Sequence, residues 1–473
     1  MIQKEAALLF RLIYDDALAH GSYLIGCQRT GEAVLVDPAR DVDRYFALAA
    51  AEDLRLVAGV ETHIHADYLS GMRELGERGC RLYVSGEGGA DWNYRWLGQR
   101  AGGGRYDATE LRDGDRFEVG NIRFRALHTP GHTPEHLCYT VTDAGGGADA
   151  PMGVLTGDFV FVGDVGRPDL LESAAGVVGA MEPAARDLAR SMRTFAGLEE
   201  YLQVWPAHGA GSACGKDLGA IPQSTVGYEK RFNGAVRASG DEAEFVRSIL
   251  AGQPEPPPYF ARMKRENRDG PAVLGALPEP TKMVCGTIPG DAVLVDCRPW
   301  DRFRAGHRPG SINAPLDRQF ITTVGSYIEP GRPIVLVAAG QDIVPAVRGL
   351  VRVGLDSVVG VVDPEELTGA TSSIEEISVA EASRRLESGK ARLLDVRRRG
   401  EFEEGHAGGA EHMPHVRMAE HLGAIGPEEA VMCLCRSGKR SARACGFLRA
   451  HGRSPVNVAG GFQAWEAAGL PVD

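Results

Sequence analysis

Histidine and aspartate residues recur at places where a short apolar run gives way to a polar loop. They come from four separate segments of the chain: His63, His65, Asp67, His132, Asp158 and His208. Imidazole nitrogens and carboxylate oxygens that arrive from several strand ends can converge on one cation. The sequence therefore predicts a metal site at the loop ends of a sheet.

A second reactive group lies near the C-terminus, in the segment AVMCLCRSGKRSARACGFLRAHG. Cys435 ends a predicted strand, and a short loop and a predicted helix follow. The N–H groups of such a loop can surround the sulfur, with the helix N-terminus behind it. Arg436, Lys439 and Arg440 add positive charge. This setting stabilises a thiolate or a persulfide, as a sulfur carrier requires.

The elements that position these residues follow an α/β pattern along the whole chain. Short apolar runs such as AVLVDP, RLVAGVET and PIVLVAA are typical of buried strands, and helical patterns follow most of them. In the C-terminal part, the segment from Val293 resembles the segment from Leu393. Matching Asp, Arg, Phe, Gly-His, Gly and Pro residues all lie 99 positions apart. This predicts two copies of one domain of about a hundred residues.

Two segments mark the expected boundaries. Ala251–Pro271 contains a proline cluster that cannot continue a helix or a central strand, so we predict an extended connector there. A second boundary is predicted near Leu367–Glu376. The predicted domains are therefore 1–275, 276–370 and 371–473. The short apolar run near the N-terminus is expected to be the first strand, with no leader peptide.

Composition limits the classes of function. A chain of 473 residues should form two to four domains at about 100–200 residues each. The net charge of −12 argues against a nucleic-acid binder. The sequence has no run of about 18 apolar residues, so no membrane span is predicted. The nine cysteines have no framework spacing, so we expect free thiols and a cytoplasmic location.

The first metal segment resembles the metallo-β-lactamase superfamily, whose usual motif is HxHxDH. The resemblance covers roughly residues 8–230 and implies an αββα sandwich, followed here by two further α/β domains. This chain has HIHADY, with Tyr68 at the last histidine position. In two-metal members that histidine and Asp67 help to hold the second ion, so the resemblance implies that Tyr68 weakens or abolishes the second site.

Within the superfamily, THIHADYLSG, TPGHTPEH, TGDFVFVGDVGRPDL and PAHGAG look most like the persulfide dioxygenases. The resemblance implies one Fe(II), held by His63, His132 and Asp158 as a facial triad with open positions. It also implies the reaction R–S–SH + O₂ + H₂O → R–SH + sulfite. His65 and Asp67 would then orient ligands and water from outside the metal. His208 would do the same or remain as a vestige of a second site.

Three residues are candidates for contact with the substrate. Arg167, in the GRPDL segment, is expected either to hold a carboxylate of the thiol carrier or to form an ordinary salt bridge. Cys214 follows the His208 loop and should lie near the metal. Cys27 lies in a predicted hairpin. Either cysteine is expected to accept sulfur, to line the persulfide pocket, or to be a packing thiol.

The last copy of the repeat resembles the rhodanese domains over nearly its whole length, which implies that Cys435 carries a persulfide. The middle copy has PIVLVAAGQDIVPAVRG, with Ala338 near the catalytic position, so it is expected to be inactive. The whole chain resembles fusions of a persulfide dioxygenase with rhodanese domains. That resemblance implies exchange between sulfite, persulfide and thiosulfate in sulfide detoxification. The expected partners are low-molecular-weight or protein persulfides, O₂ and a second copy of the chain in a dimer or tetramer.

Two other functions stay open. A glyoxalase-type thioester hydrolase shares the fold and the TPGHT motif, but such hydrolases usually need two metal ions, and Tyr68 counts against them. A sulfur carrier or sensor without catalysis would not need an intact His63, His132 and Asp158 set. Metal identity and oxygen consumption separate these alternatives.

Overall fold

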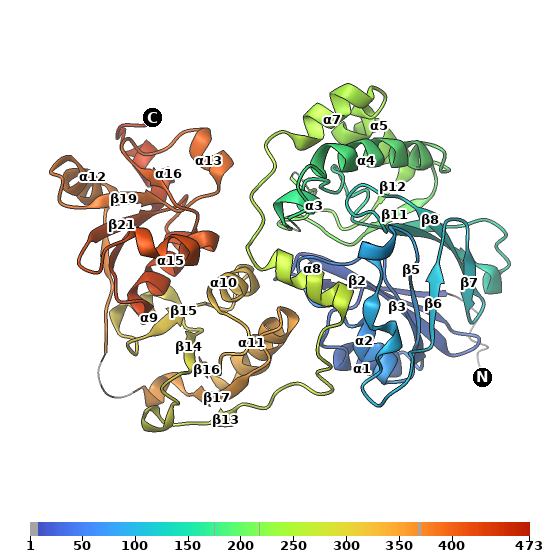
Figure 1. Cartoon of the computed structure of the whole chain (residues 1–473), viewed down its shortest axis with the longest axis horizontal. Helices are drawn as coiled ribbons and strands as arrows, with labels where there is room; N and C mark the ends of the chain where they lie inside the picture. The colour runs from blue at the N-terminus through green and yellow to red at the C-terminus, as the bar shows by residue number, and fades with distance from the viewer. Residues whose placement is uncertain (1–7, 175, 217, 368, 370) are drawn as a thin grey trace. The chain divides into compact units, whose positions relative to one another are not determined.

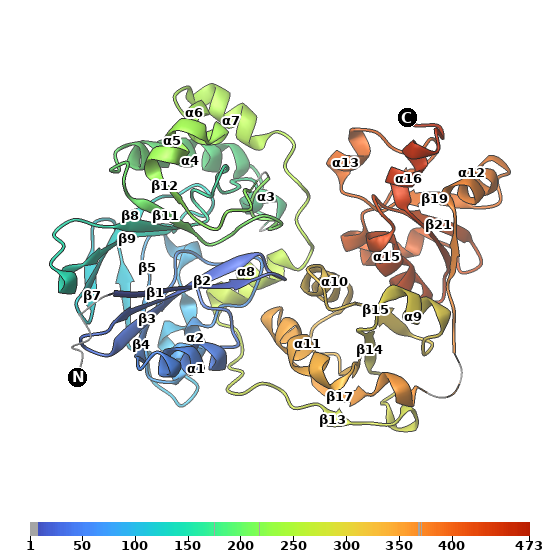
Figure 2. The ribbon, with the colours of Figure 1, turned by 180° about the vertical axis from the view of Figure 1, so that it is seen from behind.

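The computed structural model of the chain describes residues 8–174, 176–216, 218–367, 369 and 371–473. It divides into two compact units, one up to Ala276 and one from Leu277 onward. Figures 1 and 2 show the elements of each unit from opposite sides. Within the described part of the chain, no helix has the length and apolar content that crossing a bilayer requires.

The first unit contains two six-stranded sheets, each built from strands in sequence order or its reverse. The first sheet comprises β1 (Leu8–Asp15), β2 (His20–Cys27), β3 (Glu32–Val36), β4 (Arg55–Val60), β5 (Arg81–Ser85) and β6 (Ala108–Leu111). The second comprises β7 (Arg116–Val119), β8 (Ile122–His128), β9 (Leu137–Asp143), β10 (Gly153–Gly157), β11 (Gln203–Pro206) and β12 (Ser224–Thr225). The predicted first strand is confirmed from Leu8; its residues 1–7 lie outside the described part.

Helices cover the outer faces of both sheets (Figure 1). On the first sheet they are α1 (Asp43–Ala51) and α2 (Met72–Glu77), and on the second α3 (Leu170–Ser173), α4 (Met181–Ala196), α5 (Val226–Phe232), α6 (Gly234–Ala238) and α7 (Glu242–Leu250). One core lies between the sheets, and one lies under each helical layer. These layers are the predicted αββα sandwich, because each sheet buries both of its faces.

The segment Ala251–Pro271 corrects one prediction. Its proline cluster is irregular as expected, but the helix α8 (Phe260–Asp269) follows instead of an extended connector. Four of its residues are buried, at the spacing that one helix face produces: Phe260, Met263, Lys264 and Asn267. The prolines obscured this pattern, although a helix can start directly after such residues. The first unit therefore includes α8.

The second unit contains two five-stranded parallel sheets with the same strand topology. The first comprises β13 (Thr281–Lys282), β14 (Val293–Asp296), β15 (Ser311–Asn313), β16 (Ile334–Val337) and β17 (Val358–Val362). Its main helices are α9 (Trp300–Ala305), α10 (Phe320–Tyr327) and α11 (Gly340–Arg352). The second sheet comprises β18 (Glu375–Ile377), β19 (Arg392–Asp395), β20 (Glu411–His412), β21 (Ala430–Leu434) and β22 (Ser454–Val458). Its helices are α12 (Val379–Glu387), α13 (Arg399–Glu403), α14 (Met418–His421), α15 (Lys439–Ala450) and α16 (Gly461–Ala467).

The residues that the two copies share have matching structural contacts. Arg397 pairs with Asp395, with Nη2 and Oδ2 2.6 Å apart, and Arg298 pairs with Asp296 over the same distance. Each arginine also donates to the carbonyl of the glycine that precedes the repeated histidine. These buried charges are therefore satisfied within each copy. The repeated DxR and Gly-His residues stabilise the fold and mark no active site.

The two copies lie in one compact unit. Helix α15 of the last copy packs against the edge strand β15 of the middle copy. Arg443 forms an ion pair with Asp317, and the rings of Tyr327 and Phe447 lie 4.6 Å apart. The predicted boundary near 367–376 includes residues 368 and 370, which lie outside the described residues, so the division at 370 stays a prediction.

Candidate metal and sulfur-transfer sites

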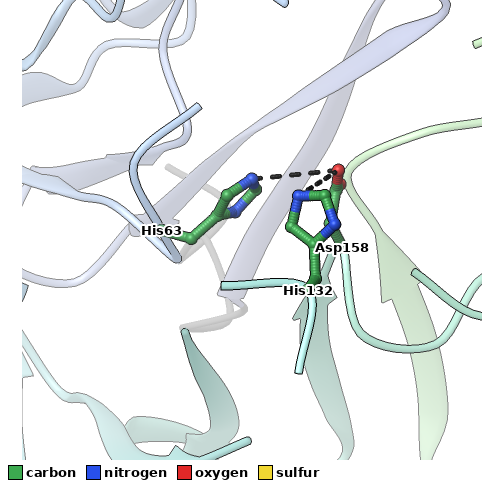
Figure 3. A group of neighbouring side chains, drawn as sticks. All are labelled: His63, His132 and Asp158. Carbon is green, nitrogen blue, oxygen red and sulfur yellow. Dashed lines mark ion pairs between the residues drawn. The ribbon is translucent and has the colours of Figure 1, made fainter. Parts of the chain in front are cut away.

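Three side chains from three strand ends meet inside the first unit. His63 follows β4, His132 lies in the loop between β8 and β9, and Asp158 follows β10. The Nε2 atoms of His63 and His132 lie 3.8 Å and 3.4 Å from Asp158 Oδ2. Figure 3 shows both rings directed at this carboxylate. All three residues are buried, and their donor atoms lie within 4.8 Å of one another.

Hydrogen bonds fix which ring nitrogen of each histidine faces the group. His132 Nδ1 lies 3.1 Å from the carbonyl of Arg167, which can only accept, so Nδ1 carries the hydrogen. Thr62 donates its hydroxyl hydrogen to Asp37, so it accepts one from His63 Nδ1 at 2.9 Å. In both rings Nε2 is then left with a free lone pair, as a metal ligand requires.

The electrostatics of the group fit a bound cation. Burial lowers the pKa of both histidines well below the usual range, so the rings are neutral. Burial also raises the pKa of Asp158 to about 6. No N–H or O–H group of the described residues makes a hydrogen bond to either oxygen of Asp158; only the Cys214 thiol approaches it. Two neutral imidazoles and one buried carboxylate are a donor set that suits a divalent transition metal.

His136 helps to position this group, a role that the sequence interpretation missed. Its Nε2 accepts a hydrogen bond from the backbone N–H of Asp158 at 3.1 Å, and its Nδ1 contacts the Thr129 hydroxyl at 2.8 Å. Burial lowers the pKa of His136 to about 3, so the ring is neutral and able to accept. A side chain at Gly166 would collide with the carbonyl of Asp158, which explains the glycine of the GRPDL segment.

The residues expected around the metal take different positions. His65 Nε2 lies 3.3 Å from Asp37 Oδ1 and belongs to neither group of candidate ligands. Burial alone would lower the pKa of His65, but Asp37 and neighbouring carboxylates raise it to about 9. The hydroxyl of Tyr68 lies 3.0 Å from His20 Nε2. His20 was not predicted as part of this network.

A second group of candidate ligands contains Asp67, His208 and Cys214, all buried and with donor atoms within 4.8 Å. His208 Nε2 lies 3.4 Å from Asp67 Oδ2 and 3.5 Å from Asp158 Oδ1, so the two groups adjoin. Tyr68 does not belong to this group. The expectation that Tyr68 weakens or abolishes a second metal site stays a prediction, although the Cys214 thiol supplies this group with a third donor.

The other two substrate candidates are not supported by their contacts. Arg167 is buried and donates to both oxygens of Asp169, at 3.0 Å and 2.6 Å, and to the carbonyl of Ala213. These bonds favour a structural role for Arg167, because the bond to Ala213 ties it to the loop that precedes Cys214. Cys27 lies at the opposite end of β2 from His20, roughly 23 Å along an eight-residue strand. This separation and its burial in the core between the sheets favour the packing alternative for Cys27.

Helix α8 supplies two buried polar side chains to this region. Asn267 Nδ2 donates to the carbonyls of His65 and Tyr68, and Asn267 Oδ1 accepts from the N–H of Ser70. The helix thus holds the HIHADY loop in place. Lys264 is also buried, and its charge lowers the pKa of His132 after the larger effect of burial. The sequence interpretation missed both residues because it assigned no helix here.

Cys435 lies directly after β21 and is 1% exposed. The N–H of Gly438 donates to its sulfur at 3.2 Å, and the Ser441 hydroxyl lies 3.5 Å from it. The carbonyl of Cys435 accepts from the N–H of Phe462 at the start of α16. A side chain at Gly461 would collide with this carbonyl. One loop N–H and one hydroxyl therefore contact the sulfur, from the side of α15.

The cations of the Cys435 loop differ in their surroundings. Arg440 forms two hydrogen bonds with Glu401, at 2.5 Å and 2.7 Å. Arg436 and Lys439 are exposed. Arg436 and Lys439 are therefore the more exposed of the three predicted cations, whereas the partly buried Arg440 is already paired with Glu401.

The middle copy has a shorter loop at the equivalent position. Asp395 pairs with Leu434 in the last copy and Asp296 with Val337 in the middle copy, so Ala338 matches Cys435. Helix α11 then begins at Gly340, after two residues instead of four. Ala338 has no thiol. Cys297 is buried on another strand end, and burial raises the pKa of its thiol. The position equivalent to Cys435 therefore cannot carry a persulfide in this copy.

Comparisons with known proteins agree with this architecture. Residues 16–208 match the metallo-beta-lactamase superfamily, and residues 287–363 and 378–468 match the rhodanese-like domain. The mitochondrial persulfide dioxygenase of Bos taurus is 26% identical over 242 residues, which cover 50% of this chain and 79% of that protein. A probable metallo-hydrolase of Burkholderia pseudomallei (strain 1710b) is 30% identical over 260 residues, covering 49% and 82%.

Among solved structures, a metallo-beta-lactamase from Staphylococcus aureus subsp. aureus COL is 37% identical, with a TM-score of 0.67. The match covers 76% of this chain and 99% of that one. The first unit ends at Ala276 and makes up less than three quarters of the chain. The match therefore extends beyond the first unit. The chain therefore belongs to the metallo-β-lactamase superfamily, and rhodanese-like domains follow its metallo-β-lactamase domain.

Proposed function

We propose that the first unit is an Fe(II) persulfide dioxygenase and that the last domain is a sulfurtransferase which acts on its product. The observation that carries the first part is the buried set of His63, His132 and Asp158. The Nε2 atoms of both imidazoles face a carboxylate that accepts no hydrogen bond from an N–H or O–H group of the described residues. The similarity to a persulfide dioxygenase supports it. The overall reaction is R–S–SH + O₂ + H₂O → R–SH + HSO₃⁻ + H⁺.

When bound, the iron supplies oxygen activation and a place for the persulfide sulfur. The protein's residues then hold the site in one arrangement. Thr62 and the Arg167 carbonyl fix the two rings, and His136 fixes the backbone of Asp158. The burial of all three candidate ligands keeps the surroundings poor in water, which strengthens every electrostatic interaction there.

The second reaction joins sulfite to the outer sulfur of a Cys435 persulfide. A sulfur–sulfur bond forms between them, the bond inside the persulfide breaks, and its electron pair stays on the Cys435 sulfur: Cys–S–S⁻ + SO₃²⁻ → Cys–S⁻ + S₂O₃²⁻. The N–H of Gly438 would stabilise the thiolate that leaves. The reverse reaction would use thiosulfate to load Cys435.

The middle domain is proposed to support the last one, since α15 begins just after the Cys435 loop and packs against β15. The proposed division of the chain is at 275 and 370. His65, Asp67, Tyr68 and His208 are proposed to order the metal surroundings, and Cys214 to accept sulfur there. The nine free cysteines fit a cytoplasmic setting, in which the enzyme would detoxify sulfide-derived persulfides.

Oxygen uptake by the anaerobically iron-loaded chain, given a small-thiol persulfide, tests the proposal. We expect uptake with release of both sulfite and thiosulfate. Absence of uptake with several persulfide carriers would overturn the oxygenase assignment but leave the sulfurtransferase in place.

One observation favours a second candidate, a thioester hydrolase with two metal ions. Asp67, His208 and Cys214 adjoin Asp158 and could hold a second ion. Metal content separates the two proposals. About one iron per chain with oxygen uptake supports the oxygenase, whereas two ions per chain with turnover of a thioester supports the hydrolase.

A further inference from the structure

Within the described part of the chain, Lys264 of α8 is a buried cation without a hydrogen-bonding partner. Lys264 is 5% exposed, and no acceptor among the described residues makes a hydrogen bond to its Nζ. Nζ lies 4.5 Å from the centre of the Trp92 ring, which gives a cation–π contact. Such a contact offsets only part of the loss of water around an ammonium group.

Lys264 lies on the buried face of α8 with Asn267, three residues on, whose amide donates to the carbonyls of His65 and Tyr68 in the loop after His63. The charge of Lys264 acts on both candidate histidine ligands, His63 and His132. The carboxylates of Glu135 and Asp158 act on Lys264 in return. Glu135 is no ion-pair partner at contact distance, because one of its oxygens accepts from the N–H of Ile64 and the other has no hydrogen bond. On the helix that Asn267 fixes to the HIHADY loop, Lys264 therefore has three N–H donors that no described residue accepts.

An unpaired buried ammonium lowers the stability of the fold. Stability therefore does not explain why a lysine occupies this position. Burial lowers the pKa of Lys264 to about 8, which leaves the group largely protonated at pH 7. An anion that enters from outside the chain would supply the missing acceptor.

We propose that Lys264 is an anion-binding group of the metal site and that its Nζ donates a hydrogen bond to an oxygen of sulfite. The identity of the anion rests on the proposed oxygenase function; the binding site itself rests on Lys264 and its surroundings. Sulfite is the oxyanion that the proposed reaction forms, and Asn267, three residues further along the same helix, holds the loop that follows the candidate ligand His63.

The chemistry of lysine favours this anion over a planar carboxylate. An ammonium group is a compact charge with three donors, whereas the guanidinium fork of arginine matches a carboxylate in two parallel bonds. Arg167, the arginine of the GRPDL segment, already uses its fork on Asp169. Lys264 also lies on the helix that Asn267 fixes to the HIHADY loop, so its position is set by the same contacts as the metal loop.

Trp92 allows binding to be measured without turnover. Sodium sulfite is titrated anaerobically into the full chain, both metal-free and zinc-loaded, with calorimetry and tryptophan emission as readouts. We expect Lys264→Met to weaken sulfite binding about tenfold or more, the size of a hydrogen bond to a charged group. Lys264→Arg should retain most of the affinity. Trp92→Phe should remove the emission change but keep the calorimetric signal.

Thermal unfolding separates this role from a structural one. Because no described residue accepts a hydrogen bond from Lys264 Nζ, Lys264→Met should leave Tm unchanged or raise it. Unchanged sulfite affinity in Lys264→Met, or a Tm that falls together with the affinity while Lys264→Arg fails to restore either, would overturn the inference. Failure of the oxygenase is seen separately, since absent oxygen uptake together with Lys264-dependent sulfite binding removes only the proposed reaction.

Discussion

The side-chain amide of Asn267 donates a hydrogen bond to the main-chain carbonyl of His65 at 2.8 Å, across 202 positions of sequence. The same amide donates to the carbonyl of Tyr68, and its oxygen accepts from Ser70. One side chain thus satisfies three buried main-chain groups of the loop that presents the candidate ligands. The first unit depends on α8, although this helix follows all the segments that carry metal motifs.

Replacement of Asn267 by leucine should therefore destabilise the first unit by about 3 kcal/mol, because it leaves three buried main-chain groups unpaired. Urea unfolding would measure this loss, and the affinity for Fe(II) should fall with it. Arg268→Ala is the matched control. Its side chain pairs with Asp269 at the surface, so we expect a change within about 0.5 kcal/mol. Equal stability of both variants would refute the role of α8.

The carboxylate of Asp158 faces two histidine nitrogens and adjoins both groups of candidate ligands. Asp158→Ala should therefore lose bound iron and oxygen uptake together. The fold should remain, because the change also removes a buried charge. Metal analysis after anaerobic loading and desalting measures the first effect. Asp149→Asn, a change in an exposed loop, should keep full iron content. Retention of iron by Asp158→Ala would refute the ligand assignment.

The sequence predicts those parts of the site that follow strands directly. His63, His132 and Asp158 each come just after an apolar run, and the edge of a sheet brings such ends together. The layers and the repeated domain were predictable for the same reason, since their patterns are local. What remained hidden depends on tertiary contacts. Lys264 belongs to a helix whose apolar spacing follows a proline cluster, and nothing local indicates that this helix reaches the metal loop.

Cys214 is a second residue whose surroundings the sequence predicts only in part. Its place after the His208 loop indicated nearness to the metal, but its grouping with Asp67 depends on how two distant loops approach. The contacts of Arg167 were equally unpredictable, because the adjacent Asp169 uses its guanidinium inside the protein. Spacing along the chain identifies candidate residues for a site. Whether a charged group is free or already paired depends on neighbours from other segments.

Cys435→Ser should abolish thiosulfate formation but leave oxygen uptake and sulfite release unchanged. The hydroxyl cannot form a persulfide, and the change lies in the second compact unit, apart from the metal residues in the first. Mass spectrometry after treatment with thiosulfate should show the added sulfur on Cys435 alone. Cys433→Ala is the control, since this thiol lies two residues earlier and is fully buried in β21. Loss of oxygen uptake in Cys435→Ser would contradict the independence of the two reactions.

The contact between Tyr327 and Phe447 predicts how the middle domain supports the last one. Tyr327→Ala should cost about 3 kcal/mol, because it leaves a cavity beside the aromatic ring on α15. Sulfurtransferase activity should then be lost at a lower temperature than in the unaltered chain, with oxygen uptake unaffected. Tyr201→Ala, at a side chain that is 57% exposed, should change neither. Unchanged heat sensitivity in Tyr327→Ala would count against a supporting role.

The ion pair between Glu401 and Arg440 predicts how the last domain responds to acid. Burial alone would raise the pKa of Glu401, but the hydrogen bonds and charge of Arg440 outweigh it and lower the pKa to about 2, from an ordinary value of 4.5. A carboxyl whose pKa is lower in the folded protein stabilises it above the unfolded pKa. This contribution is present at pH 7 and is lost as the pH falls from about 4.5 toward 2.

Glu401→Gln should therefore lower stability at pH 7, and the difference from the unaltered chain should shrink as the pH falls below about 4.5. Urea unfolding from pH 3 to pH 7, followed by circular dichroism, measures this. The side chains of Glu401 and Arg440 are 25% and 18% exposed, so salt should reduce the effect only in part. Glu404→Gln removes an exposed carboxylate of the same segment and should give a small difference that does not depend on pH. A constant difference for Glu401→Gln across this range would show that the pair with Arg440 does not hold the carboxyl ionised.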